Sequence, residues 1–291
     1  MAQSPTHRFG QIIGEVLEES LREPLAQVAR HHGLYLDYKH PRKARGGRSK
    51  VQWKDHRGNR HDLDFVLESG GCEETVGSPK AFIEIAYRRY TKHSRNKAQE
   101  IQGAITPLFE TFRDNHPFLG VVLAGVFTEA SITQLRSLGF GVLHIEFEGV
   151  VKAFQTVGID ARFDERTSDR EVQRKVKAWE QLTPRKRLRV AGALEALHRG
   201  EFDSFLGQLG ACLIRRISKV FVLPLHGQTQ ECTDVATALD FIEGFDESES
   251  FGRFDRYEIM VCFNNGDEIR GSFGSKIDAV QFLHGIQRDA H

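Results

Sequence analysis

Three acidic residues in two strand-like stretches have the types and spacing that metal-ion chemistry uses. Asp62 and Asp64 stand in RHDLDFVLE, where the alternation of side chains puts both carboxylates on one face of a strand. Glu84 follows about twenty residues later, inside the apolar stretch KAFIEIAYR. An ionised glutamate on a buried strand is costly unless it meets a cation or hydrogen-bond donors. Carboxylates that converge from two adjacent strands provide hard oxygen ligands, which favour Mg²⁺ or Mn²⁺.

Basic residues border the acidic strands on both sides. The Gly-rich loop PRKARGGRSK precedes them, and RRYTKHSRNK follows with five Lys or Arg and no acid. A phosphodiester backbone fits both features, because a metal can act on it and cations can hold it. The side chains that we expect to contact phosphates are Arg42, Lys43, Arg45, Arg48, Arg88, Arg89, Lys92 and Arg95.

Hydrophobic periodicity predicts an α/β layer with a mixed sheet over the first 150 residues. The expected order is helix, three strands, helix, strand, helix, strand. Pro24 should kink or split the first helix, and the basic loop at 41–50 should be mobile. The expected helices are 9–30, 96–112 and 131–138, and the expected strands are 34–40, a hairpin within 51–68, 80–88, 118–127 and 140–147.

The remainder of the sequence changes character twice. Residues 165–215 are mostly helical in pattern and strongly charged. The stretches 217–245 and 257–286 then repeat one order of strand, turn, strand and helix, which predicts two ββα units in a small α+β domain. We therefore expect three parts: a domain over 1–164, a helical connector over 165–215, and a C-terminal domain over 216–291.

Composition excludes several classes of protein. Forty Lys and Arg balance forty Asp and Glu, so net charge alone predicts no partner. Four dispersed cysteines form no CxxC pair, and no HExxH or GxxxxGK[ST] motif occurs, which argues against zinc sites and ATP hydrolysis. No apolar stretch approaches a membrane span and no signal region opens the sequence, so we expect a soluble cytoplasmic protein.

The order of elements resembles the PD-(D/E)XK nuclease superfamily, which has the restriction-endonuclease-like fold. The resemblance covers roughly residues 9–147 and is carried by Asp64, Glu84 and the helix RNKAQEIQGAI. It implies that Asp64 and Glu84 hold Mg²⁺, for which Mn²⁺ could substitute. It also implies Asp62 as a second-choice ligand and Glu15 as a further acid on the first helix.

The sequence departs from the family at one important position. The lysine that normally stands two residues after the glutamate is replaced by Ala86. Ala86 is small enough to leave room for a long side chain from elsewhere. Lys97, which flanks the apolar face of the next helix, is the first candidate for that role. Lys92 in the intervening turn is the second.

The resemblance implies a metal-dependent endonuclease that hydrolyses DNA, such as a type II restriction or phage-defence nuclease. Cutting both strands needs two sites, so a homodimer is the default expectation. A partner methyltransferase or defence-system subunit would fit the same role. Two alternatives stay open. One is a catalytically inactive nucleic-acid-binding protein on the same fold, and the other is a protein-interaction subunit that uses its ββα units.

Overall fold

The computed structural model describes residues 4–90, 94–214, 216–225, 227–248, 254–264 and 268–289. The chain divides into two compact units, Met1–Gly210 and Ala211–His291, and each is described by itself. The predicted phosphate contact Lys92 and the side chain of Arg95 lie outside the described residues.

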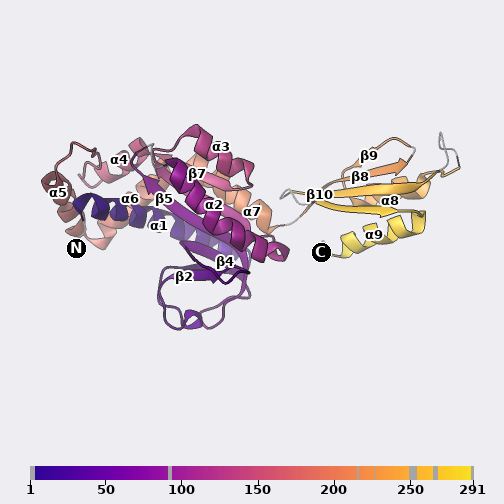
Figure 1. Cartoon of the computed structure of the whole chain (residues 1–291), viewed down its shortest axis with the longest axis horizontal. Helices are drawn as coiled ribbons and strands as arrows, with labels where there is room; N and C mark the ends of the chain where they lie inside the picture. The colour runs from indigo at the N-terminus through magenta and orange to yellow at the C-terminus, as the bar shows by residue number, and fades with distance from the viewer. Residues whose placement is uncertain are drawn as a thin grey trace. The chain divides into compact units, whose positions relative to one another are not determined.

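A five-stranded mixed sheet forms the centre of the first unit, as the sequence pattern predicted (Figure 1). Its order is β1-β4-β5-β6-β7, with antiparallel pairing from β1 to β5 and parallel pairing from β5 to β7. Every residue of β6 is buried, as expected of a strand covered on both faces. The strands are β1 (Leu34–Tyr38), β4 (Phe65–Ser69), β5 (Ser78–Arg88), β6 (Phe118–Gly125) and β7 (Gly141–Glu146).

Helices flank this sheet, and Figure 1 draws α2 in front of it and α1 behind it. Ala98 and Ile101 of α2 belong to the same apolar cluster as Phe82 and Ala86 of β5. Helix α1 contacts β1 and β5. The helices are α1 (Pro5–His31), α2 (Ser94–Thr111), α3 (Glu129–Ser137), α4 (Phe147–Gln155), α5 (Asp169–Glu180), α6 (Pro184–Leu197) and α7 (Arg199–Leu213). None of the described helices has both the length and the apolar character needed to cross a membrane.

Helix α1 passes through Pro24 without splitting. Pro24 and its neighbours Leu21 and Leu25 are all buried. Because the apolar stripe continues on both sides of the proline, side-chain packing offsets the hydrogen bond that proline cannot donate. The split predicted as one of two outcomes at Pro24 does not occur.

The segment predicted as a helical connector belongs to the first unit up to Gly210. Both α5 and α6 pack on α1, and α6 also packs on α4. Val172, Val176 and Trp179 of α5 are buried by this packing. The pattern of the segment predicted its helices correctly, but the apolar faces of those helices are covered by the first unit.

The basic loop at 41–50 is anchored rather than free. Arg42 is fully buried, and its Nη1 lies 2.9 Å from Asp37 and 2.7 Å from Glu68. Its Nη2 also donates to the carbonyls of Cys72 and Thr75, both at 2.7 Å. The prediction that Arg42 contacts nucleic acid was therefore wrong, because its guanidinium joins the loop to the sheet.

The predicted hairpin is present but differs in detail. Strands β2 (Val51–Lys54) and β3 (Arg60–Leu63) form a separate two-stranded sheet. The expected continuous strand through 63–67 is interrupted at Asp64, and β4 begins at Phe65. Asp64 thus lies at the junction between the hairpin and the central sheet.

The second unit contains the two predicted ββα units. Its antiparallel sheet has the order β11-β10-β8-β9, so the first strands of the two units, β8 and β10, pair at the centre. Helices α8 and α9 contact each other and cover an apolar cluster that includes Val222, Ile259 and Leu283. The elements are β8 (Ile217–Leu225), β9 (Gln230–Cys232), α8 (Val235–Gly244), β10 (Arg256–Phe263), β11 (Glu268–Phe273) and α9 (Lys276–Asp289).

Candidate carboxylate centre on the central sheet

Two of the predicted metal ligands, Asp64 and Glu84, lie beside each other, with Asp64 directly before β4 and Glu84 within the adjacent β5. Phe65 of β4 pairs with Ile83 of β5 in the antiparallel register, so the next step places Asp64 opposite Glu84. The backbone N–H of Ile85 donates to Asp64 Oδ2 at 2.6 Å, which holds that carboxylate against β5. Directly opposed residues of an antiparallel pair project from the same face. The sheet therefore brings the two carboxylates together.

Burial perturbs the pKa of both carboxylates, and the negative charge of Asp64 perturbs that of Glu84 further. Burial raises the pKa of Asp64, while the Ile85 hydrogen bond and the charges of Lys97 and Lys39 act in the opposite direction. Burial raises the pKa of Glu84 to about 8, and the negative charge of Asp64 adds to the effect. Two carboxylates that share a poorly solvated site cannot both ionise easily. Such perturbation is typical of functional sites.

Lys97 lies near this pair. It stands in the first turns of α2, next to Ala98, which packs in the cluster that contains Ala86. Its positive charge lowers the pKa of both Asp64 and Glu84, and its Nζ lies 3.3 Å from Glu100. Ala86 is 2% exposed and stands on the same strand face as Glu84. The position predicted for a replacement lysine is thus close to both carboxylates, and its catalytic role stays a prediction.

The acid that α1 contributes near the pair is Glu18, which the sequence analysis missed. Glu15, the predicted residue, is 49% exposed in its side chain and pairs with Arg8 at 2.7 Å. Burial raises the pKa of Glu18, and the charge of Asp64 raises it further. Glu18 directly follows the buried Leu17, so its place at the border of the apolar stripe was the available sign.

Lys39 was also missed. It follows β1 and is exposed, and its charge lowers the pKa of both Glu18 and Asp64. In the sequence it is one of many cations near the Gly-rich loop, with nothing in the pattern to distinguish it.

Asp62 is engaged in the hairpin. Its carboxylate accepts hydrogen bonds from Lys50 Nζ at 2.5 Å and from Gln52 Nε2 at 2.9 Å. Its charge raises the pKa of Glu84 less than burial and the charge of Asp64 do. This places Asp62 at the margin of the pair, held by its own partners.

Several predicted phosphate contacts instead hold parts of the fold together. Arg45 is 8% exposed in its side chain and lies 3.1 Å from Asp37. Arg89 donates to the carbonyl of Phe163 at 2.5 Å and stacks 4.1 Å from the ring of Phe147. Arg88 is 34% exposed and lies 3.7 Å from Glu100. Of the phosphate contacts predicted in the loop, Lys43, which pairs with Glu74, and Arg48 remain exposed.

The donor set of the pair fits a hard divalent cation. Among the residues that the structure describes, no group of three or more His, Cys, Asp or Glu is arranged to hold a metal ion. Mg²⁺ usually retains several waters and binds proteins through one or two carboxylates, so Asp64 and Glu84 are a sufficient set. A cation between them would also relieve the repulsion that raises the pKa of Glu84.

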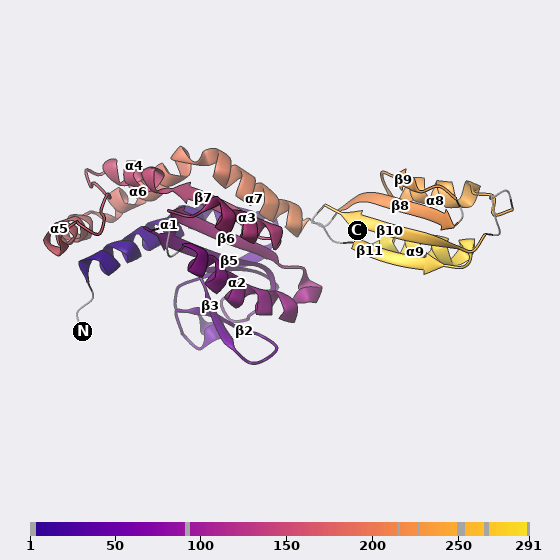
Figure 2. The same cartoon turned by 45° about the horizontal axis from the view of Figure 1, so that its top comes forward.

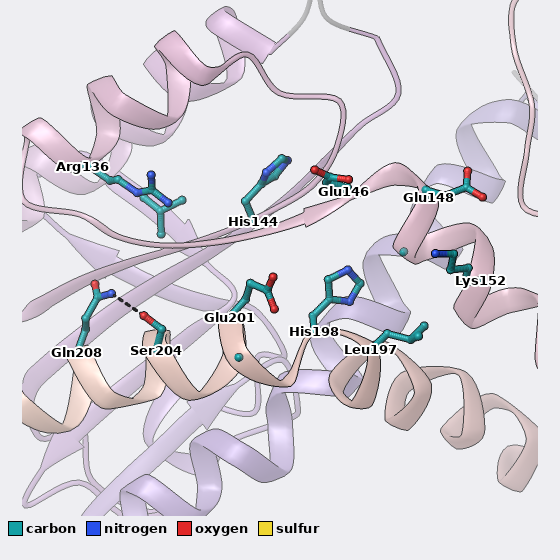
Figure 3. Close-up of a pocket in the computed structure, with 13 residues that line it drawn as sticks. Arg136, His144, Glu146, Glu148, Lys152, Leu197, His198, Glu201, Ser204 and Gln208 are labelled. Atoms are coloured by element: carbon teal, nitrogen blue, oxygen red, sulfur yellow. Dashed lines mark hydrogen bonds between the residues drawn. The ribbon is translucent and has the colours of Figure 1, made fainter.

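A separate cavity of about 820 Å³ lies at the other end of the sheet, along the edge strand β7 (Figure 3). Figure 3 shows Glu201 and His198 extending toward His144 and Glu146 across it. The Nε2 atom of His144 is buried and has no hydrogen-bond partner. Strands β5 and β6 separate this cavity from Asp64, so it is not part of the carboxylate centre.

Comparisons of the chain with protein-family models, with curated proteins and with solved structures find no match. The functional conclusion therefore depends on the geometry and chemistry of the site.

Proposed function

We propose that this protein is a Mg²⁺-dependent endonuclease that hydrolyses DNA phosphodiester bonds. The observation that carries the proposal is the placement of Asp64, directly before β4, beside Glu84 of β5, with Lys97 near both. A half-buried carboxylate pair beside a lysine is a suitable arrangement for a metal ion and an attacking water.

The arrangement of elements supports the proposal. The first unit has a mixed sheet flanked by helices, with a helix before the acidic strands and another directly after them. The resemblance to the PD-(D/E)XK superfamily depends on this same order of helix, acidic strands and helix. The restriction-endonuclease-like fold is accordingly part of what we propose.

Each residue has a distinct role in the proposed reaction. Asp64 and Glu84 would hold Mg²⁺, which when bound supplies Lewis-acid stabilisation of a phosphoryl oxygen and lowers the pKa of water. Lys97 orients the attacking water and donates a hydrogen bond to it. Glu18, on the border of the pair, adds negative charge that strengthens retention of the cation.

Cleavage of supercoiled and linear DNA by the purified protein in Mg²⁺ tests the proposal. We expect products in Mg²⁺, none in excess EDTA, and none with Glu84→Gln. Glu23→Gln is the matched control, because Glu23 is 66% exposed on the same helix and pairs with Arg30 at 2.6 Å. Cleavage that persists in Glu84→Gln, or that ignores EDTA, would refute the assignment of this centre.

Ala86 favours one alternative, a nucleic-acid-binding protein without catalysis on the same fold. That protein would retain duplex DNA in Mg²⁺ without cutting it. For the nuclease, cutting of both strands would use two copies of the chain, so a homodimer belongs to the proposal.

A further inference from the structure

We propose that the hairpin of helices α5 and α6 binds the phosphate backbone of duplex DNA through six exposed cations. The identity of the ligand rests on the proposed nuclease function. These residues are named here the α5–α6 cation surface, and both views show the two helices beside the N-terminal half of α1 (Figures 1 and 2). The residues are Arg170, Arg174, Lys177, Arg185, Lys186 and Arg189, and all are exposed.

The amphipathic pattern of α5 determines where its three cations point. Val172, Val176 and Trp179 form the buried face, at i, i+4 and i+7. Arg170, Arg174 and Lys177 each stand two residues before one of these buried residues. At about 100° per residue they lie about 200° from the buried face, so they project into solvent as one stripe.

Only three residues separate the end of α5 from the start of α6. The first turns of α6 carry their own cations. Thr183 caps α6 by accepting a hydrogen bond from Lys186 N, and Pro184 occupies the first turn. Arg187 donates to the carbonyl of Glu180 at 2.9 Å and lies 5.6 Å from the Trp179 ring. Arg187 therefore fixes the two helices together, while Arg185, Lys186 and Arg189 remain exposed.

The α5–α6 cation surface is not neutralised by the protein. None of its six side chains forms an ion pair with a side chain in the part of the chain that the structure describes. Residues 169–189 contain eight Lys or Arg and three acids, although the whole chain has no net charge. An excess of unpaired cations on one face attracts a polyanion and releases its counterions.

The start of α6 lies close to the carboxylate centre. A cavity of about 310 Å³ is lined by Glu15 and Glu19 of α1 and by Pro184 and Arg187 of α6. Glu18, which senses Asp64, stands between those two glutamates on the same helix. The start of α6 therefore borders the same turns of α1 that carry Glu18. A duplex, whose backbone carries a charge about every 1.7 Å, would extend from the α5–α6 cation surface toward the centre.

The test measures binding separately from cleavage. Fluorescence anisotropy with a labelled random-sequence duplex in EDTA is compared for the wild-type chain and the triple variant Arg185→Ala, Lys186→Ala, Arg189→Ala. We expect the variant to bind at least about tenfold more weakly near 0.1 M salt. The slope of log K against log salt should fall by about 2–3, since each lost phosphate contact removes about 0.9.

A matched control removes three other cations from the same protein. Lys219, Arg256 and Arg270 are each about half exposed or more, and each pairs with a glutamate at 2.6 Å. Their triple alanine variant should bind the duplex like wild type. Equal circular dichroism and Trp fluorescence of the α5–α6 variant and wild type would establish that its fold is retained.

The outcomes separate this inference from the nuclease proposal. Wild-type affinity and salt slope in the α5–α6 variant would overturn the inference even if the protein cleaves DNA. Weaker binding by the variant, with no cleavage by wild type in Mg²⁺, would leave the inference standing and remove the nuclease. Binding to phosphatidylserine vesicles without any duplex binding would overturn the inference in favour of an anionic lipid.

Discussion

At the residue scale, strand alternation and register account for the carboxylate pair. Alternation alone placed Asp64 and Glu84 on strand faces, and the antiparallel register then set them opposite each other. Glu18 could not be chosen over Glu15 in the same way. The rotation of α1 against the sheet is set by packing of its whole apolar stripe, which sequence spacing does not define at a single residue.

Lys97→Ala should lower kcat for DNA cleavage by roughly 10²–10⁴-fold with little change in KM, because it removes a group that positions the reacting water. Single-turnover cleavage with bound substrate measures this directly. Lys219→Ala is the matched control, since Lys219 is 53% exposed and pairs with Glu231 in the second unit. Cleavage by Lys97→Ala at the wild-type rate would contradict the role of Lys97.

The raised pKa of Glu84 predicts how the stability of the metal-free protein depends on pH. The folded state holds a proton on Glu84 up to a pKa of about 8, whereas the ordinary value is 4.5. Between these values the folded state binds more protons than the unfolded state, so the free energy of unfolding falls as pH rises. Below about pH 4.5 no such loss occurs.

Thermal unfolding of wild type and Glu84→Gln in EDTA measures this contribution as a difference. The gain in Tm of Glu84→Gln over wild type should grow from pH 5 to pH 8. Added Mg²⁺ should stabilise wild type more at pH 8 than at pH 5, because binding favours the ionised carboxylate. A pH-independent difference between the two proteins would show that Glu84 is ionised in the folded state.

At the element scale, the basic loop illustrates where a sequence pattern is ambiguous. A Gly-rich run of cations favours a solvated loop, yet Arg42 is wholly buried between Asp37 and Glu68. Both acids stand in strands and satisfy a guanidinium with several donors, which is a long-range pairing that local pattern does not contain. The break between β3 and β4 at Asp64 has the same character, because it depends on the hydrogen bond from Ile85.

Arg42→Ala should destabilise the first unit by about 3–5 kcal/mol, since it leaves the buried Glu68 without its cation and Asp37 with Arg45 alone. Urea unfolding followed by Trp fluorescence measures the change. Arg48→Ala, in the same loop but exposed, should change stability by less than about 0.5 kcal/mol. Equal effects of the two substitutions would mean that the buried ion pairs contribute no more than a surface charge.

At the scale of the whole molecule, the sequence repeat predicted the second unit correctly. The charge of residues 165–210 led to a predicted end of the first unit that lies too early in the chain. The two strand–turn–strand–helix stretches became ββα units because each needs the other to cover its apolar residues. The stretch at 165–210 was assigned to a connector because of its charge. Its buried stripe of Val172, Val176 and Trp179 packs against α1, and that packing determines which unit contains it.

Separate apolar clusters imply that the two units unfold independently. Leu283 is fully buried in the second unit, and Leu283→Ala should lower the stability of that unit by about 2–5 kcal/mol. Both tryptophans of the chain, Trp53 and Trp179, belong to the first unit, so Trp fluorescence reports that unit alone. Circular dichroism reports both units.

Leu283→Ala should therefore shift part of the thermal transition followed by circular dichroism and leave the Trp fluorescence transition unchanged. The matched variant is Leu194→Ala, also fully buried but in the first unit, which should shift the Trp fluorescence transition. If each substitution affects only its own unit, the two units unfold independently, because neither apolar cluster then depends on the other for stability. A common shift of both transitions in Leu283→Ala would instead establish that the chain folds as one cooperative body.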